Sequence, residues 1–306
     1  YIPGRDPKSA RTDSSVKISV KESGPLVASL LIESAPEGSN SLRREIRVVN
    51  GLDRVDIINT LDKKKVREKE SVHFGFPFLV PQGIIRVDEG WEIIRPEADQ
   101  LRGACKDFFS VQRWVDVSNE DYGVTWATVD APLVEVGELT DESLVNNGVR
   151  AWKETLQPTQ DFYSYVMNNY WHTNYKADQE GTVTFRYSLL PHRQFDQAAA
   201  MRFGIERTQP LLVMLATSST ELQSPLFTVE PASVIITSFK PSIDGKGWMV
   251  RLFNASGKSA DVSLKWNGAT SVTSCSSNLF EDREEQLRFP ITLASLGIKT
   301  IKVEKQ

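Results

Sequence analysis

The sequence predicts an all-β protein, in which a large antiparallel β-sandwich precedes a small immunoglobulin-like β-sandwich. Apolar and polar residues alternate with period two in many short runs, most clearly at 72–78 and 183–189. The connections between these runs are too short for helical crossovers, so neighbouring strands are expected to pair antiparallel. Only one segment, 194–207, favours a helix, because it holds three consecutive alanines and is closed by Pro210.

Two runs near the middle of the chain, 114–118 and 122–130, predict a hairpin around which the other strands are arranged. Val115 and Val117 alternate with Asp116 and Ser118 before a short polar turn. One face of this hairpin is therefore expected on a core, and the other face is expected to be polar.

The first part of the chain predicts an antiparallel meander. The run 72–78 adds a core strand, since Phe74, Phe76 and Phe78 lie on one face. Pro77 has no amide donor, so this strand should lie at a sheet edge or end there. The expected strands before and after it are 16–21, 26–33, 46–49, 55–58 and 91–96.

The second part of the chain predicts a long loop, a strong strand and then a smaller domain. The polar stretch 141–160 suits a functional loop, and Pro191 ends the strand at 183–189. We expect a large domain at 1–216, a linker at 217–233, because it is rich in Ser, Thr and Pro, and a small sandwich at 234–306. The strands expected in that sandwich are 248–254, 262–266, 287–293 and 298–303.

Composition excludes several classes of protein. The 306 residues carry a net charge of -4 with both signs interspersed, which argues against nucleic acid as a partner. No apolar run approaches the length of a membrane span.

The start of the chain at Tyr1 lacks both the apolar region of a signal peptide and an initiator Met. We therefore expect an internal piece of a longer chain, and the sequence does not determine the cellular compartment. The two cysteines, Cys105 and Cys275, are expected as free thiols.

The sequence contains no recognisable catalytic or metal motif. Its three histidines, His73, His172 and His192, are widely spaced and form no zinc-binding pattern. A nucleophile elbow, a phosphate loop and a dinucleotide fingerprint are missing from the sequence as well. We therefore assign no catalytic residue and no metal ligand, and we expect no cofactor in this chain.

The stretch 168–175 is the strongest candidate for ligand binding. Aromatic rings can stack on the apolar faces of a sugar, and amides can bind its hydroxyl groups. The alternative is a strand whose aromatic residues pack in the core and whose asparagines lie in turns. The candidate sugar-binding residues are Asn168, Asn169, Trp171, His172 and Asn174, with Asp130 and Arg95 from neighbouring segments.

Several stretches, in order and spacing, resemble the C-terminal, non-catalytic part of glycoside hydrolase family 38, the α-mannosidases, and especially its bacterial members. Each motif alone is weak, whereas the ordered set is specific and covers nearly the whole chain. The matching stretches are Phe76-Pro77-Phe78, Arg95-Pro96, residues 114–118 with Gly123-Val124, residues 185–192, residues 250–254 and residues 296–301.

The resemblance implies a galactose-mutarotase-like sandwich followed by a smaller sandwich. It also implies that zinc, the aspartate nucleophile and the acid lie in an N-terminal catalytic domain missing from this chain. The chain would then be inactive alone, would support that domain and would help to bind a mannoside or related glycan. The parent enzyme would perform retaining hydrolysis.

Two alternatives belong to other classes of protein. The first is a carbohydrate-binding or structural β module with no catalytic partner. The second is a mutarotase-like sugar epimerase, which would need a histidine and a glutamate on one concave face. In that case the histidine of the epimerase site would have to be His172 or His192.

Overall fold

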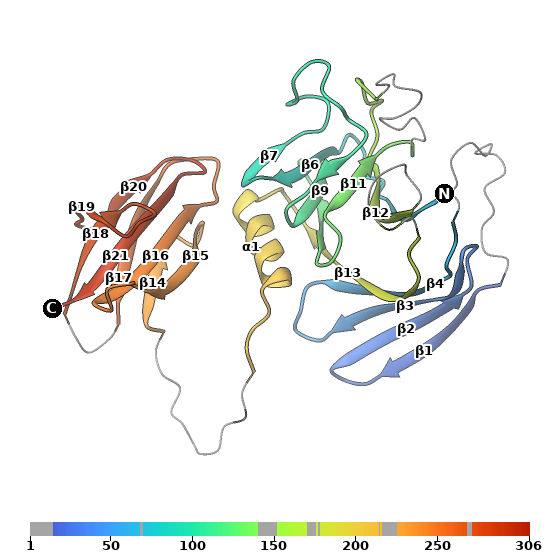
Figure 1. Cartoon of the computed structure of the whole chain (residues 1–306), viewed down its shortest axis with the longest axis horizontal. Helices are drawn as coiled ribbons and strands as arrows, with labels where there is room; N and C mark the ends of the chain where they lie inside the picture. The colour runs from blue at the N-terminus through green and yellow to red at the C-terminus, as the bar shows by residue number, and fades with distance from the viewer. Residues whose placement is uncertain are drawn as a thin grey trace. The chain divides into compact units, whose positions relative to one another are not determined.

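A computed structural model describes residues 15–67, 70–139, 152–169, 176, 178–213, 215, 225–267 and 271–306 of the chain. Antiparallel strands dominate these residues, which include a single α-helix (Figure 1). The prediction of an all-β protein built from β-sandwiches is confirmed.

The chain divides into two compact units, which are described separately. The first contains Tyr1–Phe195 and Phe203–Gln209, and the second contains Asp196–Arg202 and Pro210–Gln306. The predicted domain limits and the linker at 217–233 stay a prediction. Within that stretch, β14 (Phe227–Glu230) pairs with a strand of the small sandwich.

A wide antiparallel sheet forms one layer of the first unit. Among the described residues it has nine strands, in the order β1-β2-β3-β4-β13-β10-β9-β6-β7. Their bounds are β1 (Lys17–Ser23), β2 (Val27–Ser34), β3 (Ser39–Val49), β4 (Val55–Lys63), β13 (Gly181–His192), β10 (Gly123–Thr128), β9 (Trp114–Ser118), β6 (Ile84–Glu89) and β7 (Glu92–Ile94).

A narrower sheet forms the second layer. In the described part of the chain it has four strands in the order β5-β12-β11-β8, with bounds β5 (Glu70–Pro77), β12 (Asp161–Asn169), β11 (Leu133–Val136) and β8 (Phe109–Ser110). The strand β5 is an edge strand and ends at Pro77, as the missing amide donor of proline predicts.

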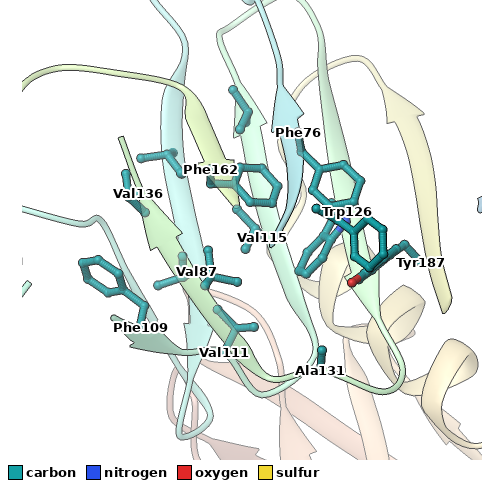
Figure 2. Packing of buried hydrophobic residues seen from close by; sticks show 14 of the residues in the cluster. Phe76, Val87, Phe109, Val111, Val115, Trp126, Ala131, Val136, Phe162 and Tyr187 are labelled. Atoms are coloured by element: carbon teal, nitrogen blue, oxygen red, sulfur yellow. The ribbon is translucent and has the colours of Figure 1, made fainter. Parts of the chain in front are cut away.

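An aromatic cluster joins the two layers. The ring centroid of Phe76 in β5 lies 5.2 Å from that of Trp126 in β10 and 5.1 Å from that of Tyr187 in β13. Phe162 of β12 completes the group, and these side chains point toward one another (Figure 2). Because the rings come from both sheets and are buried, the sheets pack face to face as a sandwich.

The hairpin predicted at 114–118 and 122–130 is present as β9 and β10, with Val115 opposite Trp126. Its polar face is buried as completely as its apolar face, since Asp116 and Ser118 are both 0% exposed. A buried polar face needs internal hydrogen-bond partners, which Thr125 and other residues provide to Asp116.

The helix α1 (Gln197–Thr208) begins three residues later than predicted. Asp196 is its N-cap, because Asp196 Oδ1 accepts hydrogen bonds from the backbone amides of Ala198 (2.9 Å) and Ala199 (3.1 Å). Pro210 follows the helix closely, as expected from the sequence.

The second unit contains a smaller sandwich. Its apolar core includes Leu252 and Ile301 from one sheet and Val262 from the other. The predicted strand at 287–293 is wrong at its start: only the part after Pro290 is a strand, because proline cannot donate to the ladder. The described strands are β14 with β17 (Ala260–Trp266) and β20 (Ile291–Leu293), and β15 (Val234–Pro241), β16 (Gly247–Asn254), β21 (Ile298–Lys305), β18 (Val272–Ser277) and β19 (Arg283–Gln286).

Cys105 and Cys275 are free thiols and belong to different units. Within the described ranges, no helix combines the length and the apolar character that crossing a membrane requires.

Replacing Tyr187 by phenylalanine is expected to cost about 1 kcal/mol of unfolding free energy, since the buried Ser164 hydroxyl loses its 3.0 Å bond to the phenol. Urea unfolding measures this as a lower midpoint with an unchanged slope. Tyr122→Phe, at a side chain that is 47% exposed, is the control. Equal midpoints for the two variants would contradict the prediction.

Candidate functional site

The face of the four-stranded sheet that is turned away from the core carries polar and aromatic side chains. Because β5 directs Phe74 and Phe76 into the core, the alternate residue His73 lies on the other face. The register places Tyr165 opposite His73 and Tyr163 opposite Gly75. These two tyrosines therefore share a face with His73.

An irregularity in β12 brings a further polar residue to this face. The register shifts between Tyr165 and Met167, and beyond it Asn168 lies opposite Ser71. A bulge of this kind redirects the side chains that follow it. We call Ser71, His73, Glu135, Tyr163, Tyr165 and Asn168 the sheet-face cluster.

Aromatic rings are stacked within the sheet-face cluster. The His73 ring lies parallel to Tyr165, with centroids 4.6 Å apart, and Phe108 lies near Tyr165 at 5.3 Å. Tyr163 packs against Gly75, where an added Cβ would approach Tyr163 Cε1 to 3.1 Å. A larger residue at position 75 would push the Tyr163 ring out of its place.

Hydrogen bonds connect His73 to a buried carboxylate. The imidazole Nε2 lies 3.2 Å from Glu135 Oε1, and Nδ1 lies 3.4 Å from Ser71 Oγ. With Glu135 ionised, Nε2–H donates to the carboxylate and Nδ1 accepts from the serine hydroxyl. The other oxygen, Glu135 Oε2, is buried without a hydrogen-bond partner.

Exposure decides which parts of the sheet-face cluster can meet a ligand. The side chains of His73 and Glu135 are only 6% and 2% exposed, whereas Tyr163 and Tyr165 are half-buried. Burial raises the pKa of Tyr163, and the nearby carboxylates of Asp161 and Glu135 raise it further. The phenol of Tyr163 is thus a neutral hydrogen-bond donor at neutral pH.

Asn168 also lines an open cavity of about 370 Å³, together with Lys176, Asp178 and Gln179. Asp178 Oδ2 accepts a hydrogen bond of 2.5 Å from Arg67 Nε, and this bond lowers the pKa of Asp178. The Asp178 carboxylate is only 2% exposed and is paired with Arg67 and Lys176. The accessible polar groups at the cavity are therefore the amide of Asn168 and the ammonium group of Lys176. Such groups can bind hydroxyl groups of a polar ligand.

A second polar group lies on the nine-stranded sheet, around the fully buried Asp116. His192 Nε2 lies 2.7 Å from Asp116 Oδ2, and Thr125 donates to the same oxygen over 2.9 Å. The hydrogen bond to Asp116 raises the pKa of His192. Asp116 thus accepts hydrogen bonds from several protein donors, which is typical of a buried network that stabilises a fold.

Two of the predicted sugar-binding residues are engaged in separate ion pairs. Arg95 binds Asp99 through two bonds of 2.9 and 2.7 Å, and Asp130 is bound in the same two-pronged way by Arg186. Each pair satisfies its own charges. A role of Arg95 and Asp130 in sugar binding stays a prediction.

The predicted stretch 168–174 is described only at its start. Asn168 belongs to the sheet-face cluster, whereas the amide of the buried Asn169 donates to the carbonyl of Val66 and fixes the backbone. Trp171, His172 and Asn174 lie outside the described residues. Their assignment to a sugar site stays a prediction.

Sequence reasoning missed the pairing of His73 with Glu135. Alternation along 72–78 places His73 opposite the phenylalanine row, which marks it as a residue outside the core. No sequence signal identifies its partner, because 62 residues separate them. Over the residues that the structure describes, no three His, Cys, Asp or Glu side chains are grouped so as to hold a metal ion.

The small sandwich matches a family model. Residues 233–301 match the model described as the glycosyl hydrolases family 38 C-terminal beta sandwich domain. The resemblance to the C-terminal region of family 38 is confirmed. The match lies within the second unit and includes β15 to β20.

Two solved structures share the fold of nearly the whole chain. An alpha-mannosidase from Enterococcus faecalis V583 has a TM-score of 0.69 at 15% identity, and the match covers 94% of this chain and 35% of that one. A glycosyl hydrolase family 38 protein from Enterococcus faecalis has a TM-score of 0.69 at 16% identity, with 94% and 36% covered. The chain thus spans about a third of the length of these proteins. No curated protein matches it.

Replacing Glu135 by alanine is expected to cost about 1–3 kcal/mol of unfolding free energy, because the buried imidazole of His73 loses its acceptor. Chemical denaturation of the chain measures this loss. Glu138→Ala, at an exposed position close by, is the matched control and should leave the midpoint unchanged. A Glu135→Ala midpoint equal to that of the wild type would show that the hydrogen bond is energetically neutral.

Proposed function

We propose that this chain is the C-terminal β region of a family-38-type glycoside hydrolase that acts on α-mannosides or related glycans. The observation that carries the proposal is the match of both sandwiches, over 94% of the chain, to an alpha-mannosidase, together with the family model on the small sandwich. In this role the chain supports a catalytic domain and contributes side chains to its sugar cleft.

The sheet-face cluster is the part of the chain best suited to meet a sugar. The half-buried rings of Tyr163 and Tyr165 offer surfaces for the C–H faces of a pyranose. Asn168 offers an amide at the rim of the cavity, next to Lys176. Buried Glu135 holds His73 in place behind the rings, so its contribution is positional.

The chemistry of hydrolysis is proposed for a domain outside this chain. The resemblance places zinc and the two carboxylates of retaining hydrolysis there. The histidines and carboxylates among the described residues are not grouped for a metal ion, so zinc has no assigned position here. The part of this chain is to bind and orient the substrate.

Hydrolysis of an aryl α-mannoside tests the proposal. The chain alone, with zinc added, is expected to give no turnover, whereas the longer polypeptide encoded by its reading frame is expected to hydrolyse the substrate. Turnover by the chain alone would overturn the assignment of chemistry to another domain. Inactivity of both proteins on a panel of aryl glycosides would overturn the assignment to a glycoside hydrolase.

A second candidate function is a carbohydrate-binding module without a catalytic partner. The half-buried tyrosines of the sheet-face cluster favour it, because they need no other domain to contact a sugar. In that case the chain alone binds mannose oligosaccharides, and Tyr163→Ala weakens binding at least about tenfold, or roughly 1.4 kcal/mol. The epimerase alternative stays a prediction: His172 lies outside the described residues, and His192 Nε2 is hydrogen-bonded to the buried Asp116.

A further inference from the structure

The nine-stranded sheet is wider than the apolar core beneath it. Buried core residues come from the central strands, such as Trp126 of β10, Tyr187 of β13 and Val115 of β9. At the margin of the core, Ile57 of β4 and Leu42 of β3 are partly buried. Among the described residues of β1 and β2, none belongs to the core cluster. Two strands of the sheet therefore extend beyond the covering layer.

These outer strands are apolar on the same face as the core. Strand registers align Tyr187 with Ile57, Ile57 with Ile46, Ile46 with Leu30 and Leu30 with Val20. Residues that are directly opposite in neighbouring strands point to the same side of a sheet. The row therefore runs without interruption from the buried core to the sheet edge.

Exposure rises along this row toward the edge. Leu30 is 42% exposed and Val20 is 66% exposed, although Tyr187 at the inner end is only 1% exposed. Leu26 extends the apolar row of β2, since the Asn50 amide donates to the Leu26 carbonyl and so continues the ladder between β2 and β3. We call this patch the apolar face, and its exposed members are Ile18, Val20, Leu26, Leu30 and Val48.

The apolar face has the character of an interface core. Proteins that act alone rarely leave contiguous apolar patches of this kind in water, whereas domain and subunit interfaces are depleted of charge at their centres. Among the described residues, the strand β1 forms the edge of this sheet. The side chains are arranged on paired strands, so the surface is preformed.

We propose that the apolar face is the surface on which another domain of the same polypeptide docks, an inference that rests on the proposed function. The chain covers 35% of the length of the alpha-mannosidase whose fold it shares, so about two thirds of such a polypeptide lies outside this chain. A neighbouring domain of that polypeptide completes the core that β1 and β2 leave open.

Paired substitutions test the proposal. Ile18→Thr with Val20→Thr keeps β-branched residues on β1 and removes apolar surface. In the chain alone these side chains are exposed, so its Tm should stay unchanged. In the longer polypeptide encoded by its reading frame, the Tm should fall by about 3 °C or more. The control is Leu79→Thr with Leu101→Thr, at residues that are 89% and 84% exposed, outside the apolar face.

Hydrogen exchange gives a second readout that does not depend on variants. Amides of 17–34 should exchange at least about tenfold more slowly in the longer polypeptide than in the chain alone. The inference would be overturned if amides 17–34 exchanged at the same rate in both proteins, or if the double substitution changed the Tm of both proteins equally. A reading frame that encodes no further domain would also overturn it. So would self-association of the chain alone that the double substitution abolishes, because a second copy would then be the occupant. If the longer polypeptide hydrolyses α-mannosides while its apolar face stays unprotected from exchange, this inference fails but the proposed function is still supported.

Discussion

Replacing Asp116 by alanine is expected to cost about 3–5 kcal/mol of unfolding free energy, the range typical for breaking a buried charged pair. The carboxylate is 0% exposed and accepts hydrogen bonds from Ser118 Oγ (2.5 Å), Thr125 Oγ1 (2.9 Å) and His192 Nε2 (2.7 Å). Arg86 Nη1 lies 3.4 Å from Asp116 Oδ1. The alanine variant leaves these donors and a cation without their shared acceptor.

The same carboxylate predicts a pH dependence of stability. Its hydrogen bond with His192 raises the pKa of the imidazole in the folded state above the ordinary value of 6.5. The folded state therefore binds a proton more tightly than the unfolded state. The stabilisation by this pair is complete below about pH 6.5 and is lost as the pH rises through the higher folded pKa.

Urea unfolding of wild type and Asp116→Ala across this pH window checks both statements. Asp121→Ala, at an exposed aspartate in the turn of the same hairpin, is the control and should unfold like the wild type. His192→Gln should remove the pH dependence that comes from this pair while costing less than Asp116→Ala. If Asp116→Ala unfolds at the wild-type midpoint, the buried network does not stabilise the fold.

Replacing Asp88 by asparagine is expected to have the opposite effect and to stabilise the chain by about 4 kcal/mol at pH 8. Asp88 is 0% exposed, and its side-chain oxygens make no hydrogen bond of good geometry, although the backbone amide of Arg113 lies near enough to stabilise the charge in part. Burial raises its pKa to about 7, although the charge of Arg113 opposes this shift. Each unit of pKa is worth about 1.4 kcal/mol, so ionising Asp88 in the fold is costly.

The pH window for Asp88 follows from the direction of its shift. The ordinary pKa of an aspartate is 3.8, so between about pH 4 and pH 7 the unfolded state loses its proton while the folded state keeps it. The stability that the neutral carboxyl allows is complete below about pH 4 and is lost as the pH rises through about 7. Asparagine does not titrate in this pH range, so the substitution removes this pH-dependent loss of stability.

Thermal or urea unfolding of Asp88→Asn at pH 5 and pH 8 measures the effect. The gain over wild type should be larger at pH 8 than at pH 5. Asp53→Asn, at an exposed position of the same unit, should show no such difference. A gain that does not depend on pH, or a loss at pH 8, would show that ionised Asp88 is compensated in the fold.

Local patterns were sufficient to predict most of the strands. Alternation at 183–189 corresponds to β13, and the run 114–118 is β9. Proline at position 77 correctly predicted the end and the edge position of β5. These predictions succeeded because period-two burial and the missing proline amide act within a few residues of the chain.

The candidate site could be predicted only in part. The sequence singled out Asn168, which lies in the sheet-face cluster, yet it gave no sign of the partner of His73. The role of Arg95 and Asp130 in sugar binding stays a prediction, and the structure places each of them in an ion pair that the sequence did not indicate. Which polar residues meet is decided by pairing between strands, and alternation along one strand does not contain that information.

By itself, the sequence determined that this chain is a protein of paired strands, with one helix near Gln197 and a small sandwich at its C-terminal end. Only the tertiary structure decided that the polar residue Asp116 is buried, that Glu135 meets His73, and that β1 and β2 extend beyond the core. The physical reason is that burial and hydrogen bonding depend on contacts between residues far apart in the chain. The propensity and period of a segment depend on its neighbours in sequence.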